Sequence, residues 1–191
     1  MLKADIFLRT DVLAILQSGG VCVVPTDTVY GLVCRAADKK AVERLYRVKA
    51  REQSPGTIIA ASVEQLVELG FPERALRSIE HYWPNPLSVV VSARAVQPYL
   101  KANRVDLPVR IPNDPALAGL LRLTGPLMTT SANTPKAPTA HTIDEARAYF
   151  DDKVDLYVDA GDLGDRPPST IIGINPDHSL VVYREGAVKI Q

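Results

Sequence analysis

The chain has 191 residues with 22 basic and 22 acidic side chains, and 46% of its residues are apolar. This length suits one domain with a substantial core, and the composition excludes a disordered chain. The net charge of zero argues against a protein whose main task is to coat nucleic acid. No apolar run approaches the roughly 18–20 residues of a membrane-spanning helix, and the N-terminus lacks a signal-peptide pattern. We therefore expect one domain over residues 1–191, in the cytoplasm and without membrane contact.

Capping residues and apolar runs divide the chain into short elements. The pairs Ser62/Gln65 and Thr142/Glu145 have capping-box spacing, and Asp38 suits an N-cap, so each marks the start of a helix. Apolar runs that stop at proline or polar residues predict strands. In chain order, the expected elements are a helix at 10–17, a strand at 21–24, a helix after Asp38, a strand at 57–61, a helix from Ser62 to Gly70, a helix from Pro72 towards Trp83, strands at 87–93 and 107–111, a helix from Asp114–Pro115 to Gly125, a strand at 127–130, a helix from Thr142 to about Phe150, and strands at 154–158, 170–174 and 180–184.

The order of these elements predicts the fold class. Strands and helices intermix along the whole chain, and the last two strands flank residues 175–178, which have the composition of a hairpin turn. We therefore predict an α/β (α+β mixed) fold, with an open sheet of parallel and antiparallel strands and helices on its faces.

Basic residues gather in one short segment. Residues 38–51 contain six basic and two acidic side chains. Arg47, Lys49 and Arg51 stand at alternate positions where the helix after Asp38 is expected to end. The helix dipole favours one or two cations at such an end, but three at this spacing indicate a clamp for an anion.

Common catalytic signatures are absent from the sequence. It contains no P-loop, no dinucleotide-binding glycine motif after a strand, and no Gly-x-Ser-x-Gly elbow. Its three histidines are dispersed, and Cys22 and Cys34 fit no metal or disulfide framework. Asp159, Asp162 and Asp165 lack calcium-loop spacing, so we expect a solvated acidic loop and no metal ligands from the protein. The remaining polar loops are rich in Thr, Ser, Asn, Lys and Arg, which suit anion recognition.

Seven short segments, in order along residues 20–187, resemble the motifs of the YrdC-like threonylcarbamoyl-AMP synthases. They are Pro25-Thr26-Asp27-Thr28-Val29-Tyr30-Gly31-Leu32, Lys49-Ala50-Arg51, Trp83-Pro84-Asn85-Pro86-Leu87, Val109-Arg110-Ile111-Pro112, Ser131-Ala132-Asn133 with Pro138-Thr139 downstream, Ser169-Thr170-Ile171-Ile172, and Arg184-x-Gly186. Each segment alone would be weak evidence for the family, but seven segments in the family's order make a specific match.

The resemblance implies a fold and a reaction. The fold would be a twisted mixed sheet with a concave, positively charged cavity. ATP, L-threonine and bicarbonate (or CO₂) would be the substrates, with Mg²⁺ accompanying the phosphates, and threonylcarbamoyl-AMP and pyrophosphate the products. The activated group would then reach an adenosine of tRNA through downstream threonylcarbamoyl transferase proteins.

The resemblance also implies roles for individual residues. The catalytic pair would be Lys49 and Arg51, which hold phosphate oxygens. The threonine-binding residues would be Thr26, Arg110, Thr129 and Ser169. The ATP-binding residues would be Lys49, Arg51, Ser131, Asn133, Thr139 and Arg184. The chemistry needs no protein nucleophile, because the work consists of positioning the reactants and neutralising charge.

Two other functions fit parts of the sequence. The basic segment 38–51 fits an RNA-binding module, although the neutral chain and the lack of interleaved aromatic residues count against it. The chain also differs from the usual family residues at Glu52, Asn85, Pro108 and Glu185. These departures leave open a non-catalytic or differently specific relative that binds a nucleotide. Threonine-dependent turnover would separate the enzyme from both alternatives.

Overall fold

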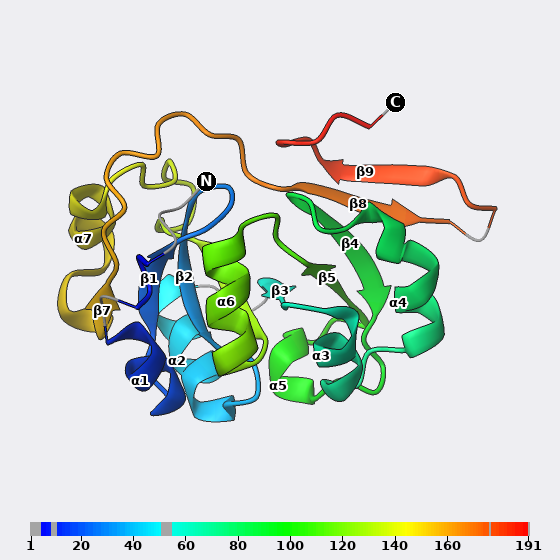
Figure 1. Cartoon of the computed structure of the whole chain (residues 1–191), viewed down its shortest axis with the longest axis horizontal. Helices are drawn as coiled ribbons and strands as arrows, with labels where there is room; N and C mark the ends of the chain where they lie inside the picture. Colours follow the sequence, from blue (N-terminus) through cyan, green and yellow to red (C-terminus); the bar gives the residue numbers. More distant parts are fainter. Residues whose placement is uncertain (1–4, 9–10, 51–54, 176, 191) are drawn as a thin grey trace.

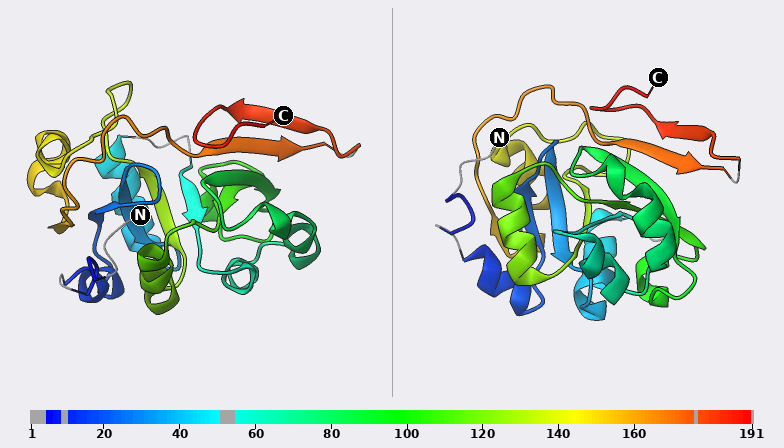
Figure 2. Two further views of the ribbon diagram at one scale, coloured as in Figure 1. Left: turned by 45° about the horizontal axis from the view of Figure 1, so that its top comes forward. Right: turned by 45° about the vertical axis from the view of Figure 1, so that its right-hand side comes forward.

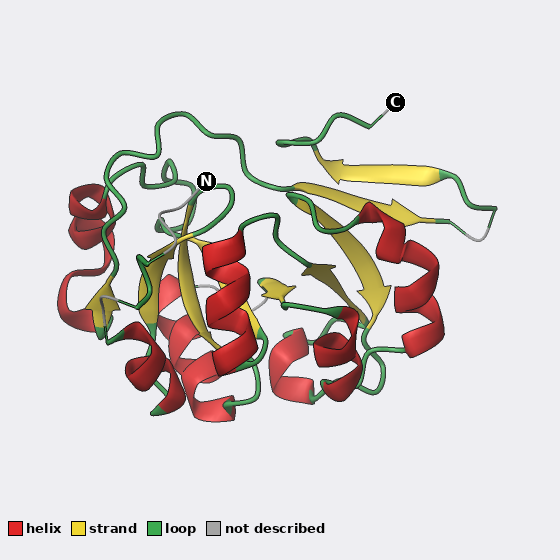
Figure 3. Ribbon diagram, in the orientation of Figure 1, coloured by secondary structure: helices red, strands yellow, loops and turns green. Residues whose placement is uncertain are grey.

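Nine strands and seven α-helices make up the described part of the chain, residues 5–8, 11–50, 55–175 and 177–190, in this computed structural model (Figures 1 and 3). The strands are β1 (Cys22–Pro25), β2 (Tyr30–Arg35), β3 (Thr57–Ile59), β4 (Leu87–Ser92), β5 (Asp106–Arg110), β6 (Leu127–Ser131), β7 (Leu156–Tyr157), β8 (Thr170–Ile174) and β9 (Leu180–Arg184). The α-helices are α1 (Val12–Gln17), α2 (Lys39–Lys49), α3 (Val63–Glu68), α4 (Glu73–Ile79), α5 (Pro98–Lys101), α6 (Pro115–Thr124) and α7 (Ile143–Phe150). Two short 3-10 helices, η1 (Glu80–Tyr82) and η2 (Asp151–Lys153), follow α4 and α7.

The strands form one mixed sheet in the order β7-β1-β2-β6-β3-β5-β4-β8-β9. Three neighbouring pairs are parallel, β1 with β7, β3 with β5 and β4 with β8, and the other pairs are antiparallel. The sheet twists so far that β8 and β9 run crosswise to β1 and β2 (Figures 1 and 2). The predicted mixed sheet with helices on its faces is confirmed.

The predicted helix starts are confirmed at the level of single hydrogen bonds. The Asp38 carboxylate accepts from the backbone N–H of Ala41 at 3.0 Å, and Ser62 and Thr142 act as N-caps in the same way. The capping boxes differ from the standard form in one detail. Gln65 Oε1 accepts from Ala61 N at 2.8 Å, so the reciprocal bond reaches the residue before the cap. The standard capping box and the form seen here both satisfy backbone N–H groups that the start of a helix leaves without partners.

One strand and one α-helix are absent from the sequence-based prediction. β2 is an interior strand, the third from one edge of the sheet, and is buried along almost its whole length. Gly31 and the turn residues before it hide the strand pattern, because glycine has low strand propensity. The short helix α5, with Pro98 at its first position, is the second omission. At the sheet edge β7 is shorter than predicted, since it pairs with β1 through two residues only.

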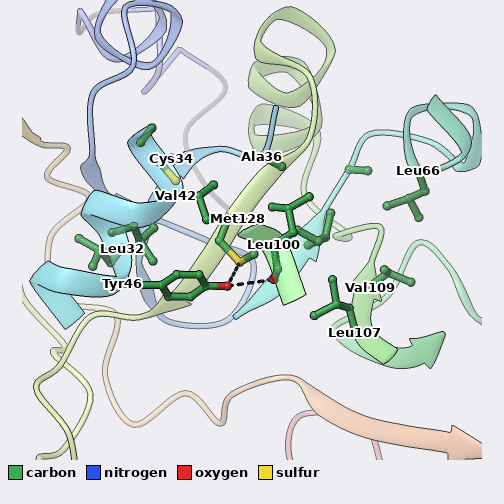
Figure 4. Packing of buried hydrophobic residues seen from close by; sticks show 14 of the residues in the cluster. Leu32, Cys34, Ala36, Val42, Tyr46, Leu66, Leu100, Leu107, Val109 and Met128 are labelled. Atoms are coloured by element: carbon green, nitrogen blue, oxygen red, sulfur yellow. Dashed lines mark hydrogen bonds between the residues drawn. The ribbon is translucent and has the colours of Figure 1, made fainter. Parts of the chain in front are cut away.

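Buried side chains alternate between the two faces of the sheet. Along β1, Val23 belongs to one apolar cluster and Cys22 and Val24 to the other, as the two-residue strand period requires. The first cluster packs against α2, where the Tyr46 hydroxyl donates to the carbonyl of Leu100 at 3.1 Å (Figure 4). The second packs against α1 and α6. Helices therefore cover both faces of the sheet around β1, β2 and β6.

The polar loops at one end of the strands do not belong to either apolar cluster. The chain leaves β7 and crosses over this edge before it enters β8, as the upper part of Figure 1 shows. The same crossing is visible in both views of Figure 2. This route lets residues 168–169 share the lining of one cleft with the turn that follows β1 and the end of β6.

The two cysteines are packed inside the apolar clusters. Cys22 and Cys34 are free thiols with no exposed surface. Burial raises the pKa of Cys22 to about 12, with a further contribution from the Asp155 carboxylate, so its reactive thiolate form is strongly disfavoured. Within the described residues, no three His, Cys, Asp or Glu side chains gather as metal ligands would. None of the helices described here has the length and apolarity needed to traverse a lipid bilayer.

Substitution of Asp38 tests directly whether the N-cap of α2 stabilises the protein. Replacing Asp38 with Ala removes the acceptor for Ala41 N and should lower the free energy of unfolding by about 1 kcal/mol, the usual value of an N-cap. Asp38→Asn should lower the free energy of unfolding much less, because asparagine is nearly as good an N-cap as aspartate. Urea denaturation measures both variants, and equal losses in the two would contradict the capping role.

Candidate active site

A cleft with a volume of about 110 Å³ opens where strand ends and loops converge at the edge of the sheet. Six of the ten residues predicted from the sequence line this cleft, and they come from segments that are far apart in the chain. These six residues are Thr26, Arg110, Thr129, Ser131, Ser169 and Arg184. The described lining includes two arginines and no acidic residue, so the cleft favours an anionic ligand.

The other four predicted residues have different positions. Lys49 and Asn133 lie behind Ser131 and connect to it through hydrogen bonds. Thr139 is half-buried and is not among the described residues that line the cleft. Arg51 lies outside the described residues, as does Glu52, so the proposed clamp with Lys49 stays a prediction.

Two glycines that line the cleft allow close packing around it. A Cβ atom on Gly31 would lie 2.8 Å from Thr129 Oγ1 and 3.2 Å from Thr26 Cγ2. A Cβ atom on Gly56 would lie 2.3 Å from the carbonyl oxygen of Thr129, closer than real Cβ atoms come. Gly31 therefore allows Thr26 and Thr129 to approach each other, and Gly56 allows its own segment to pack closely against Thr129.

Thr26 shapes the turn that leads from β1 into β2. Its hydroxyl donates to the carbonyl of Val29 at 2.6 Å and accepts from the backbone N–H of Thr28 at 3.2 Å. The hydroxyls of Thr26 and Thr28 are 3.1 Å apart. This side-chain turn is the structural role that threonine often has in loops, and it also presents Thr26 and Thr28 together at the cleft.

Arg110 forms a buried ion pair below the cleft with Asp27, a residue that the sequence-based prediction missed. Arg110 Nη2 lies 3.1 Å from Asp27 Oδ1, and both side chains are 4% exposed. The other carboxylate oxygen accepts from the backbone N–H of Asn113 at 3.2 Å. Within the described residues, Arg110 Nε has no hydrogen-bond partner. Arg110 also lines the cleft, and a guanidinium is well suited to bind a carboxylate.

Burial dominates the electrostatics of this ion pair. It raises the pKa of the Asp27 carboxyl above its ordinary value, while Arg110 acts in the opposite direction. It also lowers the pKa of Arg110, and Asp27 again opposes the change. Each charge is therefore maintained by the other. The only sequence signal for Asp27 is its place between Thr26 and Thr28 in the first motif.

Lys49 anchors the loop that follows β6. Its ammonium donates to the carbonyl of Ser131 at 2.7 Å and to the backbone and side-chain oxygens of Asn133, both at 2.5 Å. The Asn133 side chain also accepts from the Ser131 hydroxyl at 2.7 Å and donates to Ala137 O at 2.6 Å. Lys49 itself is only 3% exposed. Its positive charge thus lies directly behind the part of the loop that faces the cleft.

Lys49 reaches this position because α2 ends there. The next residue, Ala50, adopts the left-handed conformation with φ of 50°, so the chain turns away from the helix axis immediately after Lys49.

The opposite wall of the cleft is held by Arg184 at the end of β9. Its Nη2 donates to the carbonyl of Ser169 at 2.7 Å and to the Ser169 hydroxyl at 3.0 Å. The Ser169 hydroxyl also lies 3.1 Å from that of Ser88 on β4. A Cβ atom on Gly186 would lie 2.2 Å from the carbonyl oxygen of Pro168, so glycine is required for this close crossing. These contacts bring the last two motifs of the sequence to the site.

The buried ion pair predicts a large effect on stability. Replacing Asp27 with Asn leaves the Arg110 charge buried without its counter-charge, which typically costs about 3–5 kcal/mol. Urea denaturation should show a loss of this size. Glu43→Gln is the matched control, because it breaks an exposed ion pair with Lys39 at 3.8 Å and should change the free energy of unfolding by less than about 1 kcal/mol. Similar small losses in both variants would show that the buried pair is not important for stability.

Comparisons with known proteins agree in covering nearly the whole chain. The Sua5/yciO/yrdC family model, described as "Telomere recombination", matches residues 14–186. The threonylcarbamoyl-AMP synthase of Marinobacter nauticus is 33% identical over 163 residues, which are 82% of this chain and 86% of that protein. The protein of the same name from Chromobacterium violaceum is 37% identical over 171 residues, which are 86% and 88% of the two chains.

Solved structures show the same architecture. E. coli YciO has a TM-score of 0.80 and 27% identity, and the match covers 96% of this chain and 91% of that chain. P. abyssi Sua5 complexed with L-threonine has a TM-score of 0.79 and 29% identity, and the match covers 91% of this chain. This chain corresponds to 52% of that Sua5 chain, or about half its length.

Proposed function

Because the chain belongs to the Sua5/YciO/YrdC family, we propose that it is a threonylcarbamoyl-AMP synthase. It would make threonylcarbamoyl-AMP and pyrophosphate from ATP, L-threonine and bicarbonate. One observation supports this proposal most directly. The cleft collects Arg110, Ser131 and Arg184 with several threonine and serine hydroxyls, which is a donor set for a carboxylate and phosphates side by side.

Arg110 is the residue best placed to bind the threonine carboxylate. It lines the cleft, and a guanidinium can donate two parallel hydrogen bonds to a carboxylate. Asp27 fixes the guanidinium from the other side, so little freedom is lost when the carboxylate binds. The hydroxyls of Thr129 and Ser169 would orient the rest of the amino acid.

The reaction needs two bond-forming steps. The threonine amine attacks CO₂ derived from bicarbonate, loses a proton and becomes a carbamate. A carbamate oxygen then attacks the α-phosphorus of ATP, and the bond from that phosphorus to the bridging oxygen of the β-phosphate breaks, which releases pyrophosphate. The protein contributes alignment and positive charge rather than a nucleophile.

Lys49 and Arg184 would provide that charge on two sides of the cleft. Through its bonds to Ser131 and Asn133, Lys49 fixes the loop that faces the phosphates. Arg184 lines the same cleft as Ser131. We propose that Arg51, with Asn133 and Thr139, completes the ATP site. Mg²⁺ would arrive bound to the ATP phosphates, since the described residues contain no group of metal ligands.

We further propose that the product leaves for downstream transferase proteins, which modify an adenosine of tRNA in the cytoplasm. An acyl phosphate of this kind is an activated donor, so its release to a partner without exposure to water would conserve it.

The decisive experiment measures pyrophosphate release from the purified protein. Release should require L-threonine and bicarbonate together, and omission of either should reduce it to background. Release that is independent of threonine would reject the proposal. ATP binding without any threonine-dependent release would instead identify a non-catalytic relative, and tight salt-sensitive RNA binding without ATP binding would identify an RNA-binding module.

Lys49→Ala tests the charge behind the loop. The variant should lose about 100-fold or more in kcat/KM, because it removes the fixed positive charge and frees the Ser131–Asn133 loop. Lys40→Ala, which removes the same charge from an exposed position on α2, should retain wild-type activity. Circular dichroism verifies that both variants fold, and equal activity in the two would exclude this role for Lys49.

A further inference from the structure

A buried hydroxyl group contacts one of the residues that line the cleft. Ser88 lies on β4 and has no exposed surface. The neighbouring strand β8 runs parallel to β4 and pairs Thr170 with Leu87. This pairing places Ser169, the residue before β8, next to Ser88, and the two hydroxyl oxygens are 3.1 Å apart. Ser169 lines the cleft, so this contact connects Ser88 with the site.

The hydrogen-bond partners of the two serines determine which of them is the donor. A hydroxyl group has one proton to donate and two lone pairs that accept. Within residues 5–8, 11–50, 55–175 and 177–190, the Ser169 hydroxyl is the one hydrogen-bond partner of the Ser88 hydroxyl. If Ser169 donated to Ser88, the buried Ser88 proton would have no acceptor, which is unfavourable. Ser88 is therefore the donor in this pair.

The second partner of the Ser169 hydroxyl is also a donor. Arg184 Nη2 donates to this hydroxyl at 3.0 Å, and a guanidinium has no lone pair with which to reverse the bond. Ser88 and Arg184 therefore occupy both lone pairs of the Ser169 oxygen. The proton of Ser169 has no acceptor in the part of the chain that the structure describes. Ser169 can offer this proton to a ligand in the cleft.

A hydroxyl group with this arrangement suits one part of the amino acid better than the others. With both lone pairs occupied, Ser169 can donate to a carboxylate oxygen but cannot accept from an ammonium group. Arg110, which also lines the cleft, presents donors as well. We propose that Ser88 is a positioning residue that makes Ser169 a hydrogen-bond donor to the threonine carboxylate. The threonine amine then stays free to attack CO₂. The inference rests on the proposed function, in which threonine is a substrate.

Steady-state kinetics of pyrophosphate release, with threonine and ATP varied in turn, tests this role. Ser88→Ala removes the bond that orients the Ser169 hydroxyl. The KM for threonine should rise at least about threefold, because the ligand must then order this hydroxyl. The KM for ATP should stay near the wild-type value, since both bonds from Arg184 to the Ser169 carbonyl remain. Ser92→Ala, at the exposed end of the same strand, is the matched control and should change neither value.

A double-mutant cycle shows whether Ser88 acts through Ser169. Ser169→Ala alone should raise the KM for threonine about tenfold or more, the usual effect of losing a hydrogen bond to a charged group. In this background Ser88→Ala should cause no further rise, because the hydroxyl that it orients is absent. If the effects of the two substitutions multiply instead, Ser88 acts independently of Ser169 and the assignment is wrong.

The remaining outcomes separate this inference from the function on which it rests. If Ser88→Ala leaves the KM for threonine unchanged, or raises the KM for ATP equally, the assignment is wrong and the synthase proposal stands. If the wild type shows no threonine-dependent turnover, both proposals fail. Should Ser88→Ala not fold, Ser88→Cys keeps a similar size with a much weaker donor. This variant should then show the same selective rise in the KM for threonine.

Discussion

The buried pair of Arg110 and Asp27 is the interaction on which the site depends most. A guanidinium in an apolar environment is unfavourable unless a counter-charge and hydrogen bonds compensate it. Asp27 supplies the charge from the turn after β1, and Arg110 stands at the end of β5. The pair therefore ties together two segments that the sheet order separates by three intervening strands. Arg110 also lines the cleft.

Lys49 is a second buried cation close to the cleft. Its ammonium donates to backbone and side-chain oxygens of Ser131 and Asn133, and Ser131 lines the cleft. Contacts within the protein therefore hold both Arg110 and Lys49 in fixed positions. Two fixed cations suit a site in which a carboxylate binds and negative charge develops on a leaving group.

The sequence alone was sufficient to predict most helices and strands and much of the cleft, for physical reasons. Helix caps such as Asp38 act through local hydrogen bonds, so their pattern predicts them reliably. Five of the six predicted residues that line the cleft converge because they belong to motifs at strand ends, and Thr129 joins them from within β6. Asp27 and β2 could not be recognised in the same way. The role of Asp27 arises only when distant β5 brings Arg110 to it, and Gly31 conceals β2 because it serves the packing of Thr26 and Thr129.

The order of the strands has a consequence for how the protein acquires its activity. β1 pairs with β7, so Cys22 lies beside Leu156, and β6 is inserted between β2 and β3. Such pairings between remote segments must wait for large loops to close, which makes folding slow. Because every wall of the cleft belongs to this sheet or its connecting loops, no partially synthesised chain can hold the complete set of ligand contacts. Substrate binding thus becomes a late event in the maturation of each newly made molecule.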